Sequence, residues 1–278
     1  MGPNDWRDHA VSPWSWRRAP NQAGGADPPA KGEAGGFFVM CDDLGGCRAY
    51  LKPLKTASKP NEARAAREKI VSDLAYDLAF SVPPVLLTER TDNKSGEEKY
   101  ACVSKVLYPR QWPWQMVKRL VIDPSSSPKA GAIVMAAMPR AAAEGLALDT
   151  WVSQPDHNDH PHNILFGYEP GGTDAGAFVF LDFAWALGFA GRWEGDLWKK
   201  GDPVPFPPHM LRFCDRDALR QAVERIEKLP ESGIREIVTR VPEPYLTNQQ
   251  KEEIITGLLG RQTLVRTILA PQLQKGTP

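Results

Sequence analysis

The hydrophobic pattern of the chain changes once, near Trp112, and this change limits the folds that it can adopt. Before that point, short apolar runs alternate with turn residues around one helix-like segment, which is typical of strands. After it, apolar residues recur mainly at helical spacing. Because 278 residues can form one large core or two smaller ones, the pattern predicts an α+β protein with a β-rich N-terminal half and a mostly helical C-terminal half.

Composition excludes several classes of protein. Lys plus Arg and Asp plus Glu both number 34, so the net charge is zero and there is no basic field to hold a nucleic-acid backbone. No apolar run approaches the length that spans a bilayer, and the first residues lack a secretory signal. The four cysteines form no CxxC pair, so neither a disulfide framework nor a cysteine zinc site is expected. We therefore expect a soluble, cytoplasmic protein that binds neither nucleic acid nor membranes.

The N-terminal half is expected to combine strands with one helix. Gly45 and Gly46 lie between two apolar runs and predict a hairpin turn. Helical spacing between flanking prolines predicts a helix over 61–80, and its charge run REKIVSD is expected on the solvated face. Residues 1–35 are rich in Gly, Pro and Ala, so we expect a partly ordered segment whose three tryptophans suggest docking. The predicted strands are 37–40, 47–53, 84–88 and 100–107.

The C-terminal half is expected to contain helices and one further hairpin. Pro139 cannot continue a helix interior, so two helices are predicted, one on each side of it. The sequence EPGGTDAG between two apolar runs predicts a hairpin turn. Thr247 and Gln250 have the spacing of a capping box, which predicts the start of a late helix. The other predicted segments are helices 129–138, 141–152 and 219–229 and strands 164–166 and 178–181.

One polar segment, 156–163, concentrates groups that carry chemistry. It holds two carboxylates, Asp156 and Asp159, with two amides and three of the five histidines of the chain. Such side chains bind metals or transfer protons. Pro155 and Pro161 argue against a helix, so the groups are expected on a loop that leads into a buried strand. Asp156 and Asp159 are therefore candidate catalytic residues.

The second feature is the carboxylate of Asp182, which ends the apolar run FVFLD. Taken alone, an aspartate at a strand end is more often a turn or capping residue. The predicted hairpin changes this, because it brings the start of one strand, at Asn163, beside the end of the other, at Asp182. An amide and a carboxylate in that position could share one hard cation.

A third feature pairs Lys52 with Glu68. Lys52 follows the turn that contains Gly45 and Gly46, and glycines let a backbone approach a ligand closely while a lysine reaches phosphate oxygens. Glu68 lies three residues before Val71, so it borders the apolar face of the predicted helix. A glutamate near the core requires a partner, and a strand lysine would serve.

Taken in order, these features resemble the protein-kinase-like superfamily, in particular HipA-like kinases. The resemblance covers nearly the whole chain after its first 35 residues. It is carried by RAYLKP, by the helix segment AAREKIVSDLAYDLAFSVPPV, by the Asp and Asn loop, by Asp182-Phe183-Ala184, and by the C-terminal VPEPYLTNQQKEEIITGLLGRQTLVRTIL.

The resemblance implies a two-lobed fold, with a small N-terminal lobe over 36–108 and a larger lobe over 109–278. It also implies ATP and Mg²⁺ as cofactors and roles for particular residues. Gly45, Gly46 and Lys52 would contact the nucleotide and Glu68 would pair with Lys52, while the proposed magnesium ligands are Asn163 and Asp182. The implied activity is transfer of a phosphoryl group to an unidentified acceptor, with a protein hydroxyl favoured by analogy.

The loop departs from the family pattern at the catalytic base. The base usually lies five residues before the metal-binding asparagine, and here that position is Asn158, which cannot accept a proton as a carboxylate does. Asp156 lies seven residues before Asn163 and Asp159 lies four before it. We prefer Asp156 because it follows the predicted helix as in the family, and Asp159 is the second choice.

Two other functions compete with a kinase. The irregular loop leaves open a pseudokinase that binds nucleotide and works as an interaction module. A metal-dependent hydrolase would instead use His157, His160 and His162 together with Asp156 or Asp159. This last hypothesis explains the loop but leaves the lysine and glutamate of the N-terminal half without a function.

Overall fold

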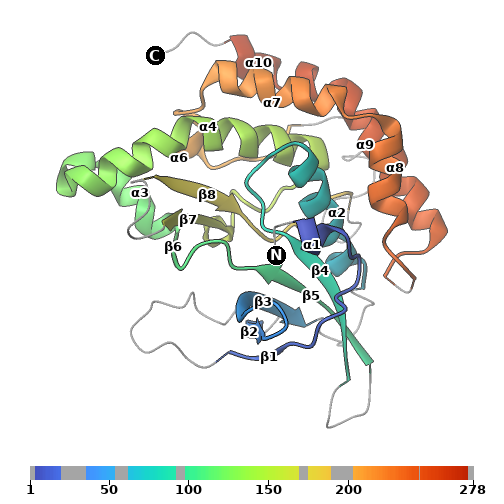
Figure 1. Ribbon diagram of the computed structural model, residues 1–278. Helices are drawn as coiled ribbons and strands as arrows, with labels where there is room; N and C mark the ends of the chain where they lie inside the picture. The colour runs from blue at the N-terminus through green and yellow to red at the C-terminus, as the bar shows by residue number, and fades with distance from the viewer. Residues whose placement is uncertain are drawn as a thin grey trace.

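The computed structural model describes residues 4–19, 36–53, 62–91, 98–168, 175–188, 203–243 and 245–274. Its N-terminal region is built on a five-stranded antiparallel sheet, and its C-terminal region consists mainly of helices around a smaller sheet (Figure 1). The predicted α+β class, with a β-rich N-terminal region and a helical C-terminal region, is confirmed.

The five-stranded sheet has the order β1-β2-β3-β5-β4, and all of its neighbouring strands are antiparallel. Gly45 and Gly46 adopt positive φ angles of 65° and 78° in the tight turn between β2 and β3, as the glycine pair predicted. The strands are β1 (Arg17–Arg18), β2 (Phe37–Cys41), β3 (Cys47–Pro53), β4 (Val85–Thr91) and β5 (Glu98–Lys105).

Each face of this sheet is covered by a different part of the chain. Helix α2 (Glu62–Asp77) packs on one face, where Leu87 and Cys102 join the main core. The N-terminal segment, which includes α1 (Asn4–Arg7), covers the other face with Trp6, and Trp6 is 2% exposed. The docking suggested by the N-terminal tryptophans therefore takes place on the sheet.

The C-terminal region places helices over a three-stranded antiparallel sheet of order β6-β7-β8 (Figure 1). Its strands are β6 (Arg110–Pro113), β7 (Ile164–Tyr168) and β8 (Gly176–Phe180). Its helices are α3 (Trp114–Ile122), α4 (Pro128–Val152), α6 (Pro208–Leu211), α7 (Arg216–Lys228), α8 (Glu231–Thr239), α9 (Asn248–Ile268) and α10 (Ala270–Gln274), with short 3₁₀ turns at Pro124–Ser126 and Pro161–Asn163.

Helix α4 corrects two predictions. It continues through Pro139, although two separate helices were expected. The loss of one backbone hydrogen bond costs about 3 kcal/mol, and burial of the helix against α7, α9 and β8 offsets this cost. By length and composition α4 could cross a membrane, so the expectation that no apolar run approaches that length was wrong. In the fold, 56% of its apolar window is buried, as in the core helix of a globular domain.

Several local predictions are confirmed, and some elements were missed. Thr247 caps α9, and its side chain and that of Gln250 form both bonds of the predicted capping box. The predicted hairpin of β7 and β8 and the helix α7 are present. Strand β6 and helix α8 were not predicted. The turn residues 169–174, the loop residues 92–97 and the glycine- and proline-rich segment 20–35 lie outside the described part of the chain.

A pair of helix glycines provides a test of the packing. A Cβ atom at Gly145 in α4 would overlap the buried ring of Phe180, whereas a Cβ at the exposed Gly260 in α9 would meet no atom within 4 Å. We expect Gly145→Ala to destabilise the protein by about 1–3 kcal/mol. Gly260→Ala should stabilise it by about 0.5–1 kcal/mol, because alanine favours a helix. Urea unfolding measures both changes, and a stabilising Gly145→Ala would contradict this packing.

Candidate functional site

Three charged side chains from distant parts of the chain meet beside α2. Nζ of Lys52 lies 2.6 Å from Oε1 of Glu68 and 3.2 Å from Oδ1 of Asp182. The Glu68 side chain is 4% exposed, so its carboxylate is almost completely removed from water. A buried carboxylate requires a partner, and Lys52 supplies it. The site therefore unites a strand lysine, a helix glutamate and an aspartate at a strand end.

Alternation along β3 explains why Lys52 faces α2. Successive side chains of a strand point to opposite faces of a sheet. Leu51 lies with Trp6 under the N-terminal segment, so its neighbour Lys52 lies on the face that α2 covers. Cys102 of β5 pairs with Lys52 in the sheet and belongs to the core on that same face. A slip of one residue in this register would turn Lys52 away from Glu68.

The end of β8 delivers Asp182 in a constrained conformation. Its φ of 62° lies in the left-handed region, which residues other than glycine seldom adopt. Nε2 of Gln154 donates to the carbonyl oxygen of Asp182 at 2.7 Å and holds this backbone. The amide of Leu181 donates to the carbonyl oxygen of Asn163 at 2.8 Å, so Asn163 and Asp182 lie at adjacent ends of β7 and β8. Conformations of this kind are concentrated at functional sites.

The electrostatics of the cluster keep Lys52 and Asp182 charged. Burial alone would lower the pKa of Lys52, but the Asp182 and Glu68 carboxylates raise it well above its ordinary value. Burial opposes ionisation of Asp182, yet the Lys52 ammonium group holds the pKa of that carboxyl below its ordinary value. Burial, opposed by Lys52 and assisted by the negative charge of Asp182, raises the pKa of Glu68 to about 7. The ammonium group of Lys52 thus lies between two carboxyl groups that compete for it.

His157 is a buried connector within the loop. Its Nδ1 lies 2.8 Å from Oδ2 of Asp149 in α4, and its Nε2 lies 2.8 Å from the carbonyl oxygen of Leu181. Both partners are acceptors, so both ring nitrogens act as donors. Burial would lower the pKa of His157, but the Asp149 carboxylate raises it above its ordinary value. Because both nitrogens are engaged, the proposed use of His157 as a metal ligand in a hydrolase was wrong.

The two candidate bases have different surroundings. Oδ1 of Asp156 lies 2.6 Å from Nδ1 of His160, and Asp156 is 9% exposed. Asp159 is exposed, and its carboxylate accepts a hydrogen bond from Asn158. The pKa of His162 is lowered by burial and by His160, and the charges of Asp182, Asp156 and Lys52 also act on it. Asp156 is therefore the more enclosed of the two candidate bases and the one that His160 holds.

The glycine turn lies apart from the cluster. The amide of Gly45 donates to the carbonyl oxygen of Asp42 and that of Gly46 to the carbonyl oxygen of Cys41, which closes the turn on itself. Six residues of extended strand separate Gly46 from Lys52, a distance of roughly 20 Å. The structure thus brings Lys52, Glu68 and Asp182 together and leaves the glycine pair at the far end of β3.

Helix α2 corrects one prediction and reveals a second buried ion pair. Every residue from 65 to 75 is buried, so the charge run REKIVSD does not lie on a solvated face as expected. Lys69 and Asp73 are 1% and 4% exposed, and Nζ of Lys69 donates to Oδ1 of Asp73 at 2.9 Å. Helical periodicity alone classed these residues as surface, because it carries no information about how many neighbours surround the helix.

Sequence reasoning missed the residues that support the site. Asp149 and Gln154 are completely buried and hold the loop and the strand end through His157 and Asp182. Asp149 lies eight residues before His157, inside an apolar helix, and a buried carboxylate in such a run was an available signal. Gln154 offered no comparable signal, since one glutamine before a proline is common in loops.

Comparisons with known proteins bear on the fold. No protein-family model and no curated protein matches the sequence. The solved structure of CtkA, a proinflammatory kinase of Helicobacter pylori, matches with a TM-score of 0.58 and 14% identity, over 90% of this chain and 96% of CtkA. HipA of a Shewanella oneidensis MR-1 toxin-antitoxin system, solved with HipB and operator DNA, gives 0.45 and 12%, over 81% and 60%. A microcompartment-associated aminopropanol kinase gives 0.29 and 11%, over 98% of each chain. The likeness to CtkA confirms the kinase-like fold that the sequence resemblance predicted.

Proposed function

We propose that the protein is an ATP-dependent phosphotransferase that acts on a protein hydroxyl. The observation that carries this proposal is the contact of Lys52 with both Glu68 and Asp182. This contact in a kinase-like fold supports Lys52 as the cation that binds phosphate, Glu68 as the carboxylate that orients it and Asp182 as a candidate metal ligand.

The oxygen donors at the ends of β7 and β8 fit a magnesium ion. Mg²⁺ prefers carboxylate and carbonyl oxygens, and Asn163 and Asp182 supply one of each type. Their adjacency and the ionised state of Asp182 support this assignment. When bound, the ion neutralises negative charge on the phosphates of the nucleotide.

The side chains of the site would divide the work as follows. Lys52 binds phosphate oxygens of ATP, and Glu68 fixes the direction of the ammonium group. Asp156 accepts the proton of the acceptor hydroxyl, and His160 holds one of its oxygens in place. Gly45 and Gly46, at the far end of β3, would let the backbone of the turn approach the nucleotide closely.

One observation favours a second candidate, a nucleotide-binding pseudokinase. Asn158 occupies the position where the catalytic base is expected. A metal-dependent hydrolase is less well supported. Among the residues that the structure describes, no group of three or more His, Cys, Asp or Glu side chains is placed to hold a metal ion.

Ligand-induced stabilisation tests the nucleotide site directly. A ligand that binds the folded state raises the melting temperature. We expect ATP with Mg²⁺ to stabilise the protein more than ATP alone, and zinc to have no such effect. Stabilisation by zinc without any nucleotide effect would contradict the proposed function and favour the hydrolase.

The choice of base is tested with two matched variants. We expect Asp156→Asn to lower transfer of labelled phosphate from ATP by about 10²–10⁴-fold, because the acceptor hydroxyl loses its base. Asp159→Asn should leave the rate within about twofold, since Asp159 is exposed. Both variants should bind MgATP as the wild type does. The reverse pattern would assign the base to Asp159, and binding without transfer in the wild type would establish the pseudokinase.

A further inference from the structure

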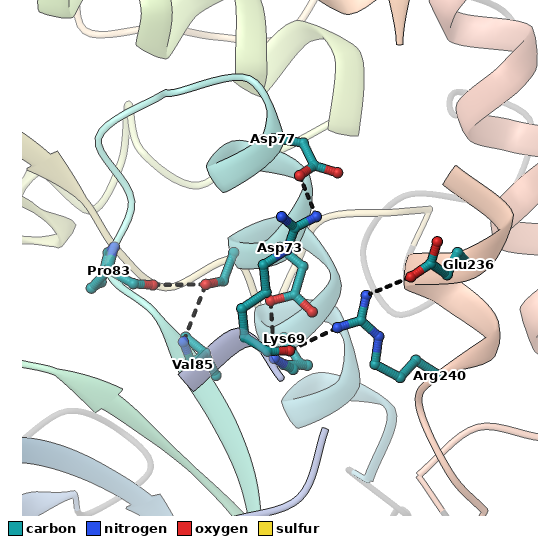
Figure 2. A network of polar contacts seen from close by, with 9 residues as sticks. Lys69, Asp73, Asp77, Pro83, Val85, Glu236 and Arg240 are labelled. Atoms are coloured by element: carbon teal, nitrogen blue, oxygen red, sulfur yellow. Dashed lines mark hydrogen bonds and ion pairs between the residues drawn. The ribbon is translucent and has the colours of Figure 1, made fainter. Parts of the chain in front are cut away.

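Helix α2 carries Glu68, so the position of this helix determines whether Lys52 has its partner. The helix is fixed at two points besides Glu68. Oγ of Ser72 donates to the carbonyl oxygen of Pro83 at 2.8 Å and accepts from the amide of Val85 at 3.1 Å, which joins α2 to the start of β4. Between these points the buried pair of Lys69 and Asp73 links two successive turns of α2 itself. Figure 2 shows these contacts along α2.

The second point is Arg7, which comes from the N-terminal helix α1. Its guanidinium group forms an ion pair with Asp77, the last residue of α2, and lies 4.8 Å from the ring centroid of Tyr76. Its carbonyl oxygen accepts a hydrogen bond from Nη1 of Arg240 at 2.7 Å. Arg240 follows α8 and also contacts Glu236 of that helix, at 3.5 Å (Figure 2). One residue thus connects the end of α2 with the C-terminal region.

The segment around Arg7 is itself anchored to the sheet. The side chain of Trp6 is buried in the apolar cluster on the outer face. The amide of Leu87 donates to the carbonyl oxygen of Ala10 at 3.0 Å, and the amide of Ser12 donates to that of Leu87 at 2.7 Å. The segment 6–12 therefore joins the edge of the sheet at β4, the end of helix α2 and the residue Arg240 that follows helix α8.

The charges at this junction act on one another. Burial raises the pKa of Asp73, and the positive charges of Lys69, Arg240 and Arg7 oppose that rise. The junction is thus coupled to the buried pair one turn before Asp77. Glu68 and Asp77 are nine residues apart on a single helix, so roughly 14 Å of rigid rod separates them. A tilt of α2 at Asp77 would be transmitted to Glu68.

We propose that Arg7 is a positioning residue for the phosphoryl-transfer site, acting through α2. Arg7, whose carbonyl oxygen is bound by Arg240 after α8, holds Asp77, and this sets the distance between Glu68 and Lys52. The inference rests on the proposed function, because it assigns Glu68 the task of orienting a nucleotide-binding lysine. The side chains of Arg7 and Asp77 are 31% and 20% exposed, so water partly screens this pair and its loss is expected to affect the position of α2 more than the folding of the protein.

Hydrogen exchange tests the tether without any nucleotide. We expect amides in the second half of α2 to exchange faster in Arg7→Ala and in Asp77→Ala than in the wild type. The matched control is Arg235→Ala, which removes an exposed arginine of α8 that pairs with Glu231 and Glu252. In Arg235→Ala, the amides of α2 should exchange at the same rate as in the wild type. Equal exchange rates in Arg7→Ala and the wild type would show that the contact of Arg7 with Asp77 does not hold α2. This result would not depend on whether the protein binds ATP.

Nucleotide affinity tests the functional consequence. We expect Arg7→Ala to weaken MgATP binding by on the order of fivefold, with little change in melting temperature. The double variant Arg7→Ala with Asp77→Ala should be no weaker than either single variant, because both remove one contact. Arg7→Lys, which keeps the charge, should recover part of the affinity and serves if Arg7→Ala does not fold. Faster exchange with unchanged affinity would overturn the positioning role. A wild type that does not bind MgATP would overturn the proposed function, while exchange still decides whether Arg7 holds α2.

Discussion

Lys52→Met is expected to reduce phosphoryl transfer by at least about 10²–10³-fold. The substitution keeps the length of the side chain and removes its charge. Lys52 is the cation that the structure places between Glu68 and Asp182, at 2.6 Å and 3.2 Å. Without the Lys52 ammonium group, the phosphate oxygens lose their positive partner. The carboxyl groups of Glu68 and Asp182 are also left without the cation that lies between them. The measurement is transfer of labelled phosphate from ATP, together with MgATP affinity.

A variant that unfolds would lose phosphoryl transfer just as a variant without the phosphate-binding cation would. This prediction therefore requires two controls. Removing one partner of a buried pair costs about 3–5 kcal/mol, and Lys52→Met alone is expected to melt at a lower temperature. Lys52→Met with Glu68→Gln should recover stability, because the uncompensated carboxylate is gone, and should remain inactive. Lys105→Met removes the last lysine of the neighbouring strand β5 and should retain activity. Transfer at the wild-type rate in Lys52→Met would contradict the proposed site.

Local chemistry made much of the fold predictable. The glycine pair of the β2–β3 turn, the prolines that flank α2 and the capping box at Thr247 each act within a few residues, so the sequence around them contains the cause. The continuation of α4 through Pro139 could not be predicted from local sequence. Its cost is local, but the burial that offsets it comes from α7, α9 and β8, which lie far away in the sequence.

In the site, too, features with a local cause could be predicted from the sequence, and features that depend on distant contacts could not. A glutamate that borders an apolar face requires a cation as its partner, so the sequence alone pointed to Lys52. Burial of Lys69 and Asp73 in the same helix could not be predicted, because it depends on the N-terminal segment and α8 closing over a helix that already packs on a sheet. The three loop histidines look alike in the sequence. Contact with Asp149 distinguishes His157, and that contact depends on how α4 lies against the loop.

His157→Leu is expected to destabilise the protein by about 3–5 kcal/mol, because it leaves the Asp149 carboxylate buried without a partner. It also removes the donor to the carbonyl oxygen of Leu181, next to Asp182, so MgATP binding should weaken. His162→Leu is the matched control, since His162 is an exposed histidine of the same loop, and it should leave the free energy of unfolding within about 0.5 kcal/mol. Urea unfolding measures both. Equal stability of the two variants would contradict the connecting role of His157.

The dependence of this loss on pH identifies its cause. Asp149 raises the pKa of His157 in the folded state above its ordinary value. A group of this kind stabilises the fold fully below the ordinary histidine pKa, and its contribution disappears as the pH rises through the folded value. The gap between wild type and the double variant His157→Leu with Asp149→Leu, in which no buried Asp149 carboxyl titrates, should therefore be larger at about pH 6 than at about pH 9. His157→Leu with Asp149→Leu should recover part of the stability at both values, because no buried charge then remains unpaired. A gap that does not change with pH would mean that the variant loses packing alone and that the buried ion pair contributes nothing.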